Sequence, residues 1–146
     1  MLFDKLFSRF KKSNGSDTRA TAAHIKTGVR GEDAACEFLK KNKYSIITRN
    51  YRAGKSEIDI IAEDRKNIVF VEVKTRTSQK GSLYGRPSDA VNRAKREYII
   101  RGAREFLRRY GKNDRRPARF DVIEIYVSGG GEISEITHIK DAFSAY

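Results

Sequence analysis

Three charged residues near the middle of the chain have the types and spacing of a phosphoryl-transfer site. Asp59 stands in one segment of alternating apolar residues, and Glu72 and Lys74 stand in the next. Alternation with a period of two is typical of strands with one buried face. Mg²⁺ in proteins takes one or two carboxylates, with water and substrate phosphate completing its shell. If the two strands pair, these residues indicate a metal-dependent phosphoryl-transfer site.

A turn at residues 64–67 joins the two predicted strands and fixes their register. Asp59 then faces Glu72, and Glu57 faces Lys74. Directly opposed like charges destabilise a sheet, so paired acids on a half-buried sheet indicate a bound cation. The alternative is a solvated hairpin face, on which Glu57 and Lys74 form an ordinary ion pair. The apolar residues that share the charged face favour the site.

The remaining elements follow from hydrophobic periodicity and capping residues. Two helices are predicted, residues 27–42 with Thr27 as the cap and residues 89–110 with Ser88 as the cap. Further strands are predicted at 45–52, 120–127 and 132–139. A helical crossover usually joins parallel strands. We therefore expect an α/β fold with a central mixed sheet flanked by helices, in a domain spanning 27–146 behind an amphipathic and flexible extension, 1–26.

One residue on each predicted helix could reach the paired acids. Glu32 borders the buried stripe of the first helix. It could complement the positive helix N-terminus, which its position favours, or it could reach the metal site. Lys95 projects among the apolar residues of the second helix. It could extend to the edge of the core or supply a second cation to the site, and both interpretations stay open.

The charge of the chain indicates a polyanionic partner. The net charge is +12, and residues 80–119 contribute 13 Lys and Arg against 4 Asp and Glu, which is +9. Such a concentrated charge is typical of proteins that bind a nucleic-acid backbone. Generic, ribosome-like basicity is the alternative. The candidate phosphate-binding residues are one arginine after Lys74 and four in one sector of the second helix: Arg76, Arg93, Arg101, Arg104 and Arg108.

Composition excludes several other classes. The 146 residues suit one domain with a sizeable core. The single cysteine, Cys36, excludes an internal disulfide, and with only two histidines a structural zinc site is disfavoured. No apolar run approaches the length of a membrane span, so no stable membrane insertion is expected. No secretory signal is apparent. A cytoplasmic protein is expected.

Several segments together resemble the YraN family of predicted bacterial endonucleases, which is distantly related to archaeal Holliday-junction resolvases and to the PD-(D/E)XK nuclease superfamily. The resemblance covers roughly residues 27–140. Ser56 and Lys43 depart from it, because the family often has glycine at both positions. The matching segments are residues 28–34, 49–52, 57–62, 69–76, 90–91 with Lys95, and 119–123.

The resemblance implies a restriction-endonuclease-like fold and Mg²⁺- or Mn²⁺-dependent cleavage of DNA, including branched or junction DNA. Asp59 and Glu72 match the metal-binding acids, with the Val73 carbonyl as a further ligand, and Lys74 matches the catalytic lysine. Glu32 matches the helix-borne acid of the resolvase branch, and Glu57 and Lys95 are of second rank.

Other functions stay open beside the nuclease. A non-catalytic module could retain the fold and the basic surface and bind DNA without cutting it. An RNA-binding or ribosome-associated factor could use the same basic helix to recognise RNA by shape. Resolvase relatives act as dimers, and the sequence is compatible with a homodimer and with a monomer.

Overall fold

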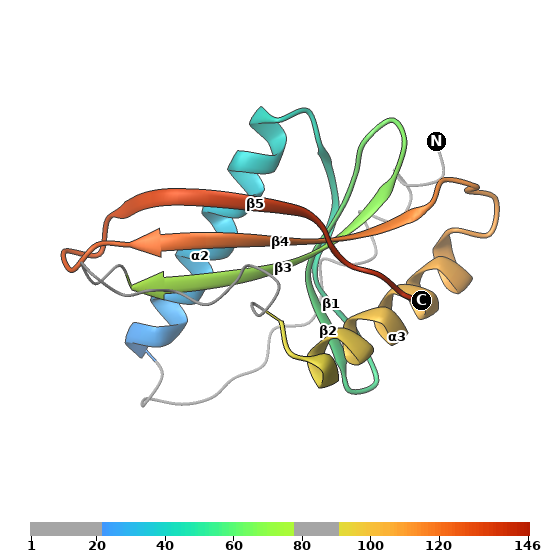
Figure 1. The fold of residues 1–146 in the computed structure, drawn as a ribbon, viewed down its shortest axis with the longest axis horizontal. Coiled ribbons are helices and arrows are strands. Elements are labelled where there is room, and N and C mark those ends of the chain that lie inside the picture. Colours follow the sequence, from blue (N-terminus) through green and yellow to red (C-terminus); the bar gives the residue numbers. More distant parts are fainter. Residues whose placement is uncertain (1–21, 78–90) are drawn as a thin grey trace.

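Five strands and two helices make up the computed structural model over the residues that it describes, 22–77 and 91–146. The sheet has a helix on each face (Figure 1). The elements in chain order are α2 (Ala22–Lys41), β1 (Ser45–Ala53), β2 (Ser56–Glu63), β3 (Ile68–Thr77), α3 (Arg93–Tyr110), β4 (Ala118–Val127) and β5 (Ile133–Phe143).

The sheet has the order β1-β2-β3-β4-β5, and only β3 and β4 run parallel. Because α3 connects those two strands, the prediction of a helical crossover and a mixed sheet is confirmed. The β2–β3 hairpin pairs Ile60 with Val71 and Ile61 with Phe70, which is the predicted register. Its turn is held by Asp64, whose Oδ1 accepts the backbone N–H of Lys66 at 2.7 Å.

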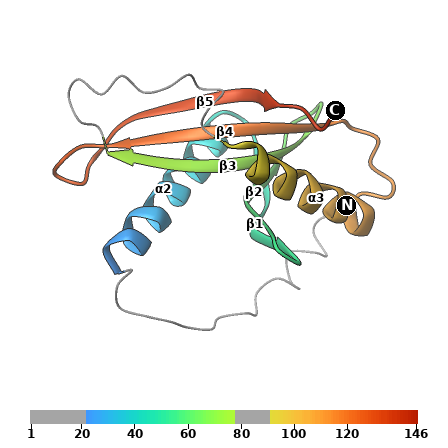
Figure 2. The same ribbon diagram turned by 60° about the horizontal axis from the view of Figure 1, so that its bottom comes forward.

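The alternative of a solvated hairpin face is wrong. Ile61, Ile68 and Phe70, the apolar residues that the sequence placed on the charged face of β2 and β3, are buried, as their presence there indicated. The reason is that helices cover both faces, as happens to strands in the interior of an α/β sheet. Figure 2 shows α2 and α3 along different parts of the sheet.

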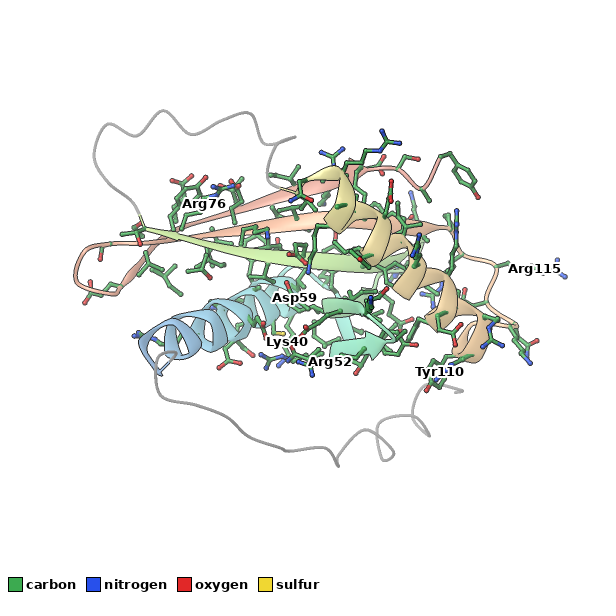
Figure 3. All side chains as sticks on the ribbon, turned by 90° about the horizontal axis from the view of Figure 1, so that it is seen from below. Lys40, Arg52, Asp59, Arg76, Tyr110 and Arg115 are labelled. Atoms are coloured by element: carbon green, nitrogen blue, oxygen red, sulfur yellow. The ribbon has the colours of Figure 1, made fainter. Side chains whose placement is uncertain are left out.

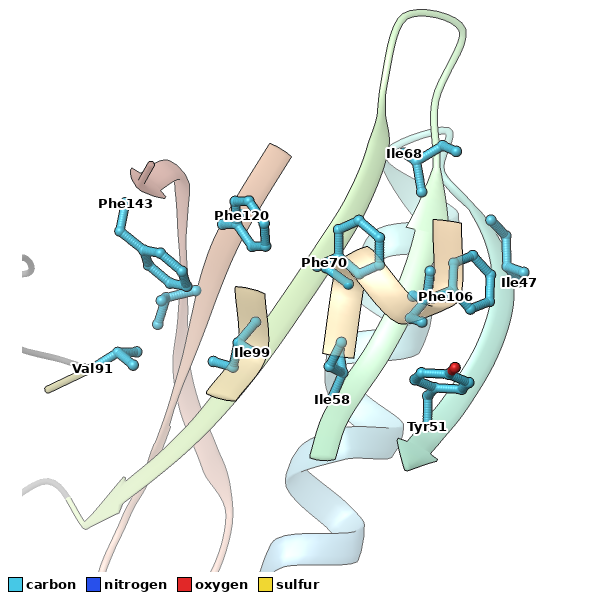
Figure 4. Close-up of a cluster of buried hydrophobic side chains, with 13 residues drawn as sticks. Ile47, Tyr51, Ile58, Ile68, Phe70, Val91, Ile99, Phe106, Phe120 and Phe143 are labelled. Atoms are coloured by element: carbon cyan, nitrogen blue, oxygen red, sulfur yellow. The ribbon is translucent and has the colours of Figure 1, made fainter. Parts of the chain in front are cut away.

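A separate apolar cluster lies under each helix. On the α3 side, Phe106 packs edge-to-face on Tyr51 and Phe70 (Figure 4). On the α2 side, Ala35 and Leu39 are fully buried. The remaining members of this second cluster come from α2 itself, from the turn after it and from the strands: Cys36, Tyr44, Ile60, Ala62, Val69, Val71, Ile123 and Ile125. The sheet is therefore held between two apolar layers.

Both helices begin at residues other than the predicted caps. The first starts at Ala22, so Thr27 lies inside α2 and is not its cap. The second starts at Arg93, and Asn92 caps it with a side chain that accepts the N–H of Lys95 at 2.9 Å. The proposed cap, Ser88, lies outside the described residues.

Two other predictions concern parts of the chain that the structure does not describe: residues 1–21 of the extension, and residues 78–88 of the basic segment that follows β3. Among residues 22–77 and 91–146, neither helix combines the length and apolar character that a membrane crossing needs. Lys43, one of the departures from the family pattern, has φ +68° directly after α2. That left-handed conformation favours glycine, the residue that the family resemblance leads us to expect there.

Candidate active site

The β2–β3 ladder opens at the position of Asp59. Its pairs extend from Glu63 with Ile68 to Ile60 with Val71. Beyond them β3 continues beside β4 while β2 turns away with β1 (Figure 1). The apolar alternation breaks at the same point, because Ile60 lies in the cluster under α2 whereas Ile58 lies in the cluster under α3. Asp59 therefore stands where the sheet splits.

The Asp59 carboxylate replaces the missing backbone partner of β3. Its Oδ2 accepts the N–H of Val73 at 2.8 Å. The N–H and C=O groups of one strand residue point to the same side, so the Val73 carbonyl also points to the opening. Figure 3 shows Asp59 between α2 and α3. A carboxylate and a backbone carbonyl, both oxygen ligands, thus point to one small region.

Glu72 lies beside this opening with a lysine near each of its oxygens. The Lys74 ammonium is 3.1 Å from Oε1, and the Lys95 ammonium, reaching from α3, is 3.6 Å from Oε2. The Glu72 side chain is only 5% exposed, and its Oε2 accepts no hydrogen bond within the described part of the chain. A buried carboxylate oxygen without a hydrogen bond is rare and costly. Such an atom indicates a ligand that binds there.

The electrostatics of the opening are those of crowded acids. Burial raises the pKa of Asp59 to about 7, with repulsion from Glu72 next in size and from Glu32 a smaller contribution, while the hydrogen bond from Val73 lowers it. Removal of water and proximity of like charges both disfavour the ionised form. Asp59 is therefore close to half protonated at neutral pH unless a cation joins it.

Glu32 approaches the opening from α2 because the helix packs closely on β3. A Cβ at Gly31 would overlap the Thr75 Oγ1, so a larger residue fits only if the Thr75 side chain moves. The contact lies next to Glu32 in the helix and next to Lys74 in the strand. Glu32 itself is 3.6 Å from the Arg49 guanidinium, which also binds Asp33 at 2.8 Å. Glu32 contributes negative charge to the site.

Replacing Gly31 with alanine is expected to destabilise the protein by about 1–3 kcal/mol, because the new methyl group overlaps Thr75. Alanine is otherwise the better helix former by about 1 kcal/mol. Adding Thr75→Ala, which removes the overlapping oxygen, should restore stability to the wild-type level or above. Urea denaturation of the three variants measures this. Equal stability of Gly31→Ala and wild type would contradict the close packing of α2 on β3.

Other candidate residues are not brought to the opening. Glu57 is not opposite Lys74, because β2 has left β3 there, and it contacts Arg52 of β1 at 3.3 Å. Arg76 donates from Nε to Glu124 Oε1 of β4 at 3.1 Å. The four arginines of α3 are exposed as predicted, two of them beside glutamates of their own helix: Arg93, Arg101, Arg104 and Arg108.

The oxygen donors at the opening fit Mg²⁺ or Mn²⁺. They comprise Asp59, Glu72 with its unbonded Oε2, and the Val73 carbonyl. Across the described ranges no three His, Cys, Asp or Glu side chains stand together with metal-binding spacing. One or two carboxylates suffice for Mg²⁺ when phosphate and water supply the rest, so the donor set suits an ion bound together with a phosphodiester.

Sequence reasoning missed a second buried acid. Asp121 of β4 is fully buried and accepts two hydrogen bonds from Arg119, both at 2.8 Å. His138 of β5 lies 2.8 Å from its Oδ2, and the N–H of Asp141 donates at 3.0 Å. Burial raises the pKa of Asp121, but these hydrogen bonds outweigh it and hold the pKa below its usual value. Every partner belongs to β4 or β5, so this acid ties the two strands together.

Comparison with known proteins shows the family. The model of the uncharacterised protein family UPF0102 matches residues 31–125, a span that contains the whole opening from Glu32 to Lys95. The chain belongs to UPF0102. This membership confirms the resemblance to the YraN family.

Several UPF0102 relatives are similar over most of their length. The proteins of Caldicellulosiruptor bescii and Geobacter metallireducens are each 45% identical over 116 residues, which cover 80% of this chain and 95% and 90% of theirs. That of Symbiobacterium thermophilum is 43% identical over 120 residues, covering 82% of this chain and 98% of its own.

A solved structure titled "Crystal structure of SSO0001" aligns with 98% of this UPF0102 chain and 77% of its own at 13% identity. Its TM-score is 0.25, which supports no argument about the fold. What the coordinates establish is an α/β fold with a mixed five-stranded sheet and two helices.

Proposed function

We propose that this UPF0102 protein is a metal-dependent nuclease that hydrolyses phosphodiester bonds in DNA and has a restriction-endonuclease-like fold. One observation carries the proposal: two acids meet where the sheet splits, and the buried Oε2 of Glu72 has no hydrogen bond while Asp59 has a pKa near 7. Glu72 is paired with both lysines, but the 3.6 Å separation from Lys95 leaves its Oε2 without a hydrogen bond, and a cation at the opening would supply the missing partner.

In this proposal Asp59, Glu72 and the Val73 carbonyl hold Mg²⁺ or Mn²⁺. When bound, the ion supplies Lewis-acid activation of a phosphoryl oxygen and of water. Glu32 assists from α2, directly or through a water molecule.

The lysines act on the developing charge. The Lys74 ammonium, one-third exposed beside Glu72, orients the attacking water and offsets negative charge in the transition state. Lys95 holds Glu72 from the side of α3. The exposed arginines of α3 bind backbone phosphates, which gives affinity without base specificity.

A cleavage assay tests the proposal. Purified protein is incubated with branched, nicked, single-stranded and duplex DNA in the presence of Mg²⁺, Mn²⁺ or EDTA. We expect metal-dependent cleavage of at least one of these by the wild type and on the order of a 10³-fold loss in Glu72→Gln, since metal-ion catalysis contributes several kcal/mol. The matched control is Glu37→Gln, which changes an exposed acid of α2 that pairs with Lys40 on the helix surface.

Two results would argue against catalysis. The first is the absence of cleavage with every DNA and both metals. The second is equal cleavage by Glu72→Gln and the wild type. Salt-sensitive DNA binding that neither metal nor Glu72→Gln alters would instead support the non-catalytic module.

A further inference from the structure

A groove of about 470 Å³ runs between the β1–β2 turn and the outer side of α3. Residues 53–56 form one wall. The other wall is a stripe of the helix with spacings of three and four residues, which place its members on one face: Tyr98, Arg101, Glu105 and Arg109. Gly102 lets the helix sit close to the strand beneath, because a Cβ there would be 3.1 Å from the Ser56 Cβ.

The groove combines positive charge with an exposed aromatic ring. Lys55, Arg101 and Arg109 line it together with one acid, Glu105. That acid is shared between Arg109 and Arg108, so the lining keeps a positive excess. Tyr98 is 39% exposed. Cations that follow a phosphate backbone and an aromatic ring on which a base stacks are the two components of single-strand binding sites.

Both walls of the groove lead to the candidate active site. Lys95, which approaches Glu72, precedes Tyr98 by about one helical turn, roughly 4.5 Å along the axis. Ser56 precedes Asp59 by three strand residues, roughly 10 Å. A strand of duplex DNA advances about 3.4 Å per nucleotide. The groove therefore lies within a few nucleotides of the proposed cleavage position.

We propose that this groove binds an unpaired nucleotide next to the scissile phosphate, with its base stacked on Tyr98 and its phosphate held by Arg101 and Lys55. The inference rests on the proposed nuclease function and defines its substrate class: DNA that is single-stranded or frayed beside the cut. In an intact duplex the base faces are stacked on each other and cannot reach Tyr98.

Binding without metal tests this assignment independently of catalysis. Fluorescence anisotropy in EDTA compares three labelled DNAs: a single strand, a blunt duplex and a duplex with a single-stranded flap. Tyr98→Ala should weaken binding of the single strand and the flap about tenfold or more, and binding of the blunt duplex less than about twofold. Tyr98→Phe, which keeps the ring, should bind all three like the wild type.

A charge control separates stacking from general attraction. Arg104→Ala removes an exposed cation of the same helix that does not line the groove. Because one phosphate contact is lost, the variant should bind all three DNAs more weakly, and by the same factor. Arg101→Ala should weaken binding of the single strand and of the flap more than Arg104→Ala does. Circular dichroism verifies that each variant is folded.

The outcomes distinguish the two proposals. If the wild type binds none of the DNAs in EDTA, the groove assignment is wrong, and the nuclease function is wrong as well only if Mg²⁺ and Mn²⁺ also give no cleavage. Suppose that the wild type binds DNA. If Tyr98→Ala then binds as tightly as the wild type, or if its affinity for all three DNAs falls by the same factor, only the unpaired-nucleotide groove is wrong.

Discussion

Replacing Asp59 with asparagine is expected to abolish metal-dependent cleavage while making the metal-free protein more stable at neutral and alkaline pH. Asparagine can still accept the N–H of Val73 through its side-chain oxygen. It removes the charge that burial and Glu72 disfavour. Loss of a metal ligand should lower the cleavage rate on the order of 10³-fold. Function and stability should therefore change in opposite directions.

The pH dependence follows from the direction of the shift. Because the pKa of Asp59 is about 7 in the folded protein and 3.8 in the ordinary state, the folded state binds more protons between these values. Stability of the metal-free wild type should then fall as pH rises from about 4 to about 7. Asp59→Asn lacks this loss, and its advantage should reach about 4 kcal/mol at pH 8 and vanish near pH 4.

Thermal denaturation of the wild type and of Asp59→Asn in EDTA, from pH 4 to pH 8, measures the difference in stability. The same measurement on the wild type with added Mn²⁺ shows how the metal changes it. Since the metal displaces the Asp59 proton, Mn²⁺ should bind more tightly as pH rises to about 8. An Asp59→Asn variant less stable than the wild type at pH 8 would show that this carboxylate is a structural acid and not a ligand.

In contrast to Asp59→Asn, which should raise stability, removing the Asp121 carboxylate should lower it strongly. Asp121→Ala leaves the Arg119 guanidinium, only 16% exposed, without its nearer carboxylate and with only the longer contact to Asp64 at 3.3 Å among the described residues. Breaking a buried ion pair by removing one partner costs about 3–5 kcal/mol, a substantial part of the stability of a domain of this size. Urea denaturation should show a correspondingly lower midpoint. The loss should shrink at low pH, where a carboxylate with a lowered pKa no longer contributes to stability.

The matched control for this prediction is Glu105→Ala. Glu105 also binds two arginines, Arg108 and Arg109, but it does so on the exposed side of α3, where ion pairs contribute little. Its denaturation midpoint should stay near that of the wild type. Equal midpoints for the two variants would mean that the carboxylate of Asp121 does not hold β4 and β5 together.

Local sequence patterns correctly predicted the features that depend on residues close together in the chain. The strands follow from alternation, the β2–β3 register from the turn at Asp64, and the parallel pair from the length of the crossover. The same register placed Asp59 opposite Glu72 and Glu57 opposite Lys74, but the ladder ends at Ile60 and Val71, before either pair. The helix starts were wrong because several polar residues near each start can cap a helix, and tertiary packing decides which one does. Asn92, not Ser88, holds the first turn of α3.

Other features depend on contacts between distant segments. The break of alternation at Asp59 arises because β2 bends to join β1 under α3, and no residue in 56–63 signals it. The approach of Glu32 depends on Gly31 meeting Thr75, two residues 44 positions apart in the chain. The Asp121 network likewise joins residues from two strands, β4 and β5. The sequence holds one signal for each of these contacts. Gly31 stands beside the candidate acid Glu32, and Asp121 is the one aspartate in an otherwise largely apolar strand.

A crystal structure of the protein soaked in Mn²⁺ tests the central claim most directly. We expect one anomalous peak where β2 leaves β3, within about 2.5 Å of oxygens of Asp59, Glu72 and the Val73 carbonyl, and we expect no such peak in crystals of Asp59→Asn. Manganese found only on surface acids, with Glu72 still held between Lys74 and Lys95, would contradict the metal site and with it the proposed hydrolysis.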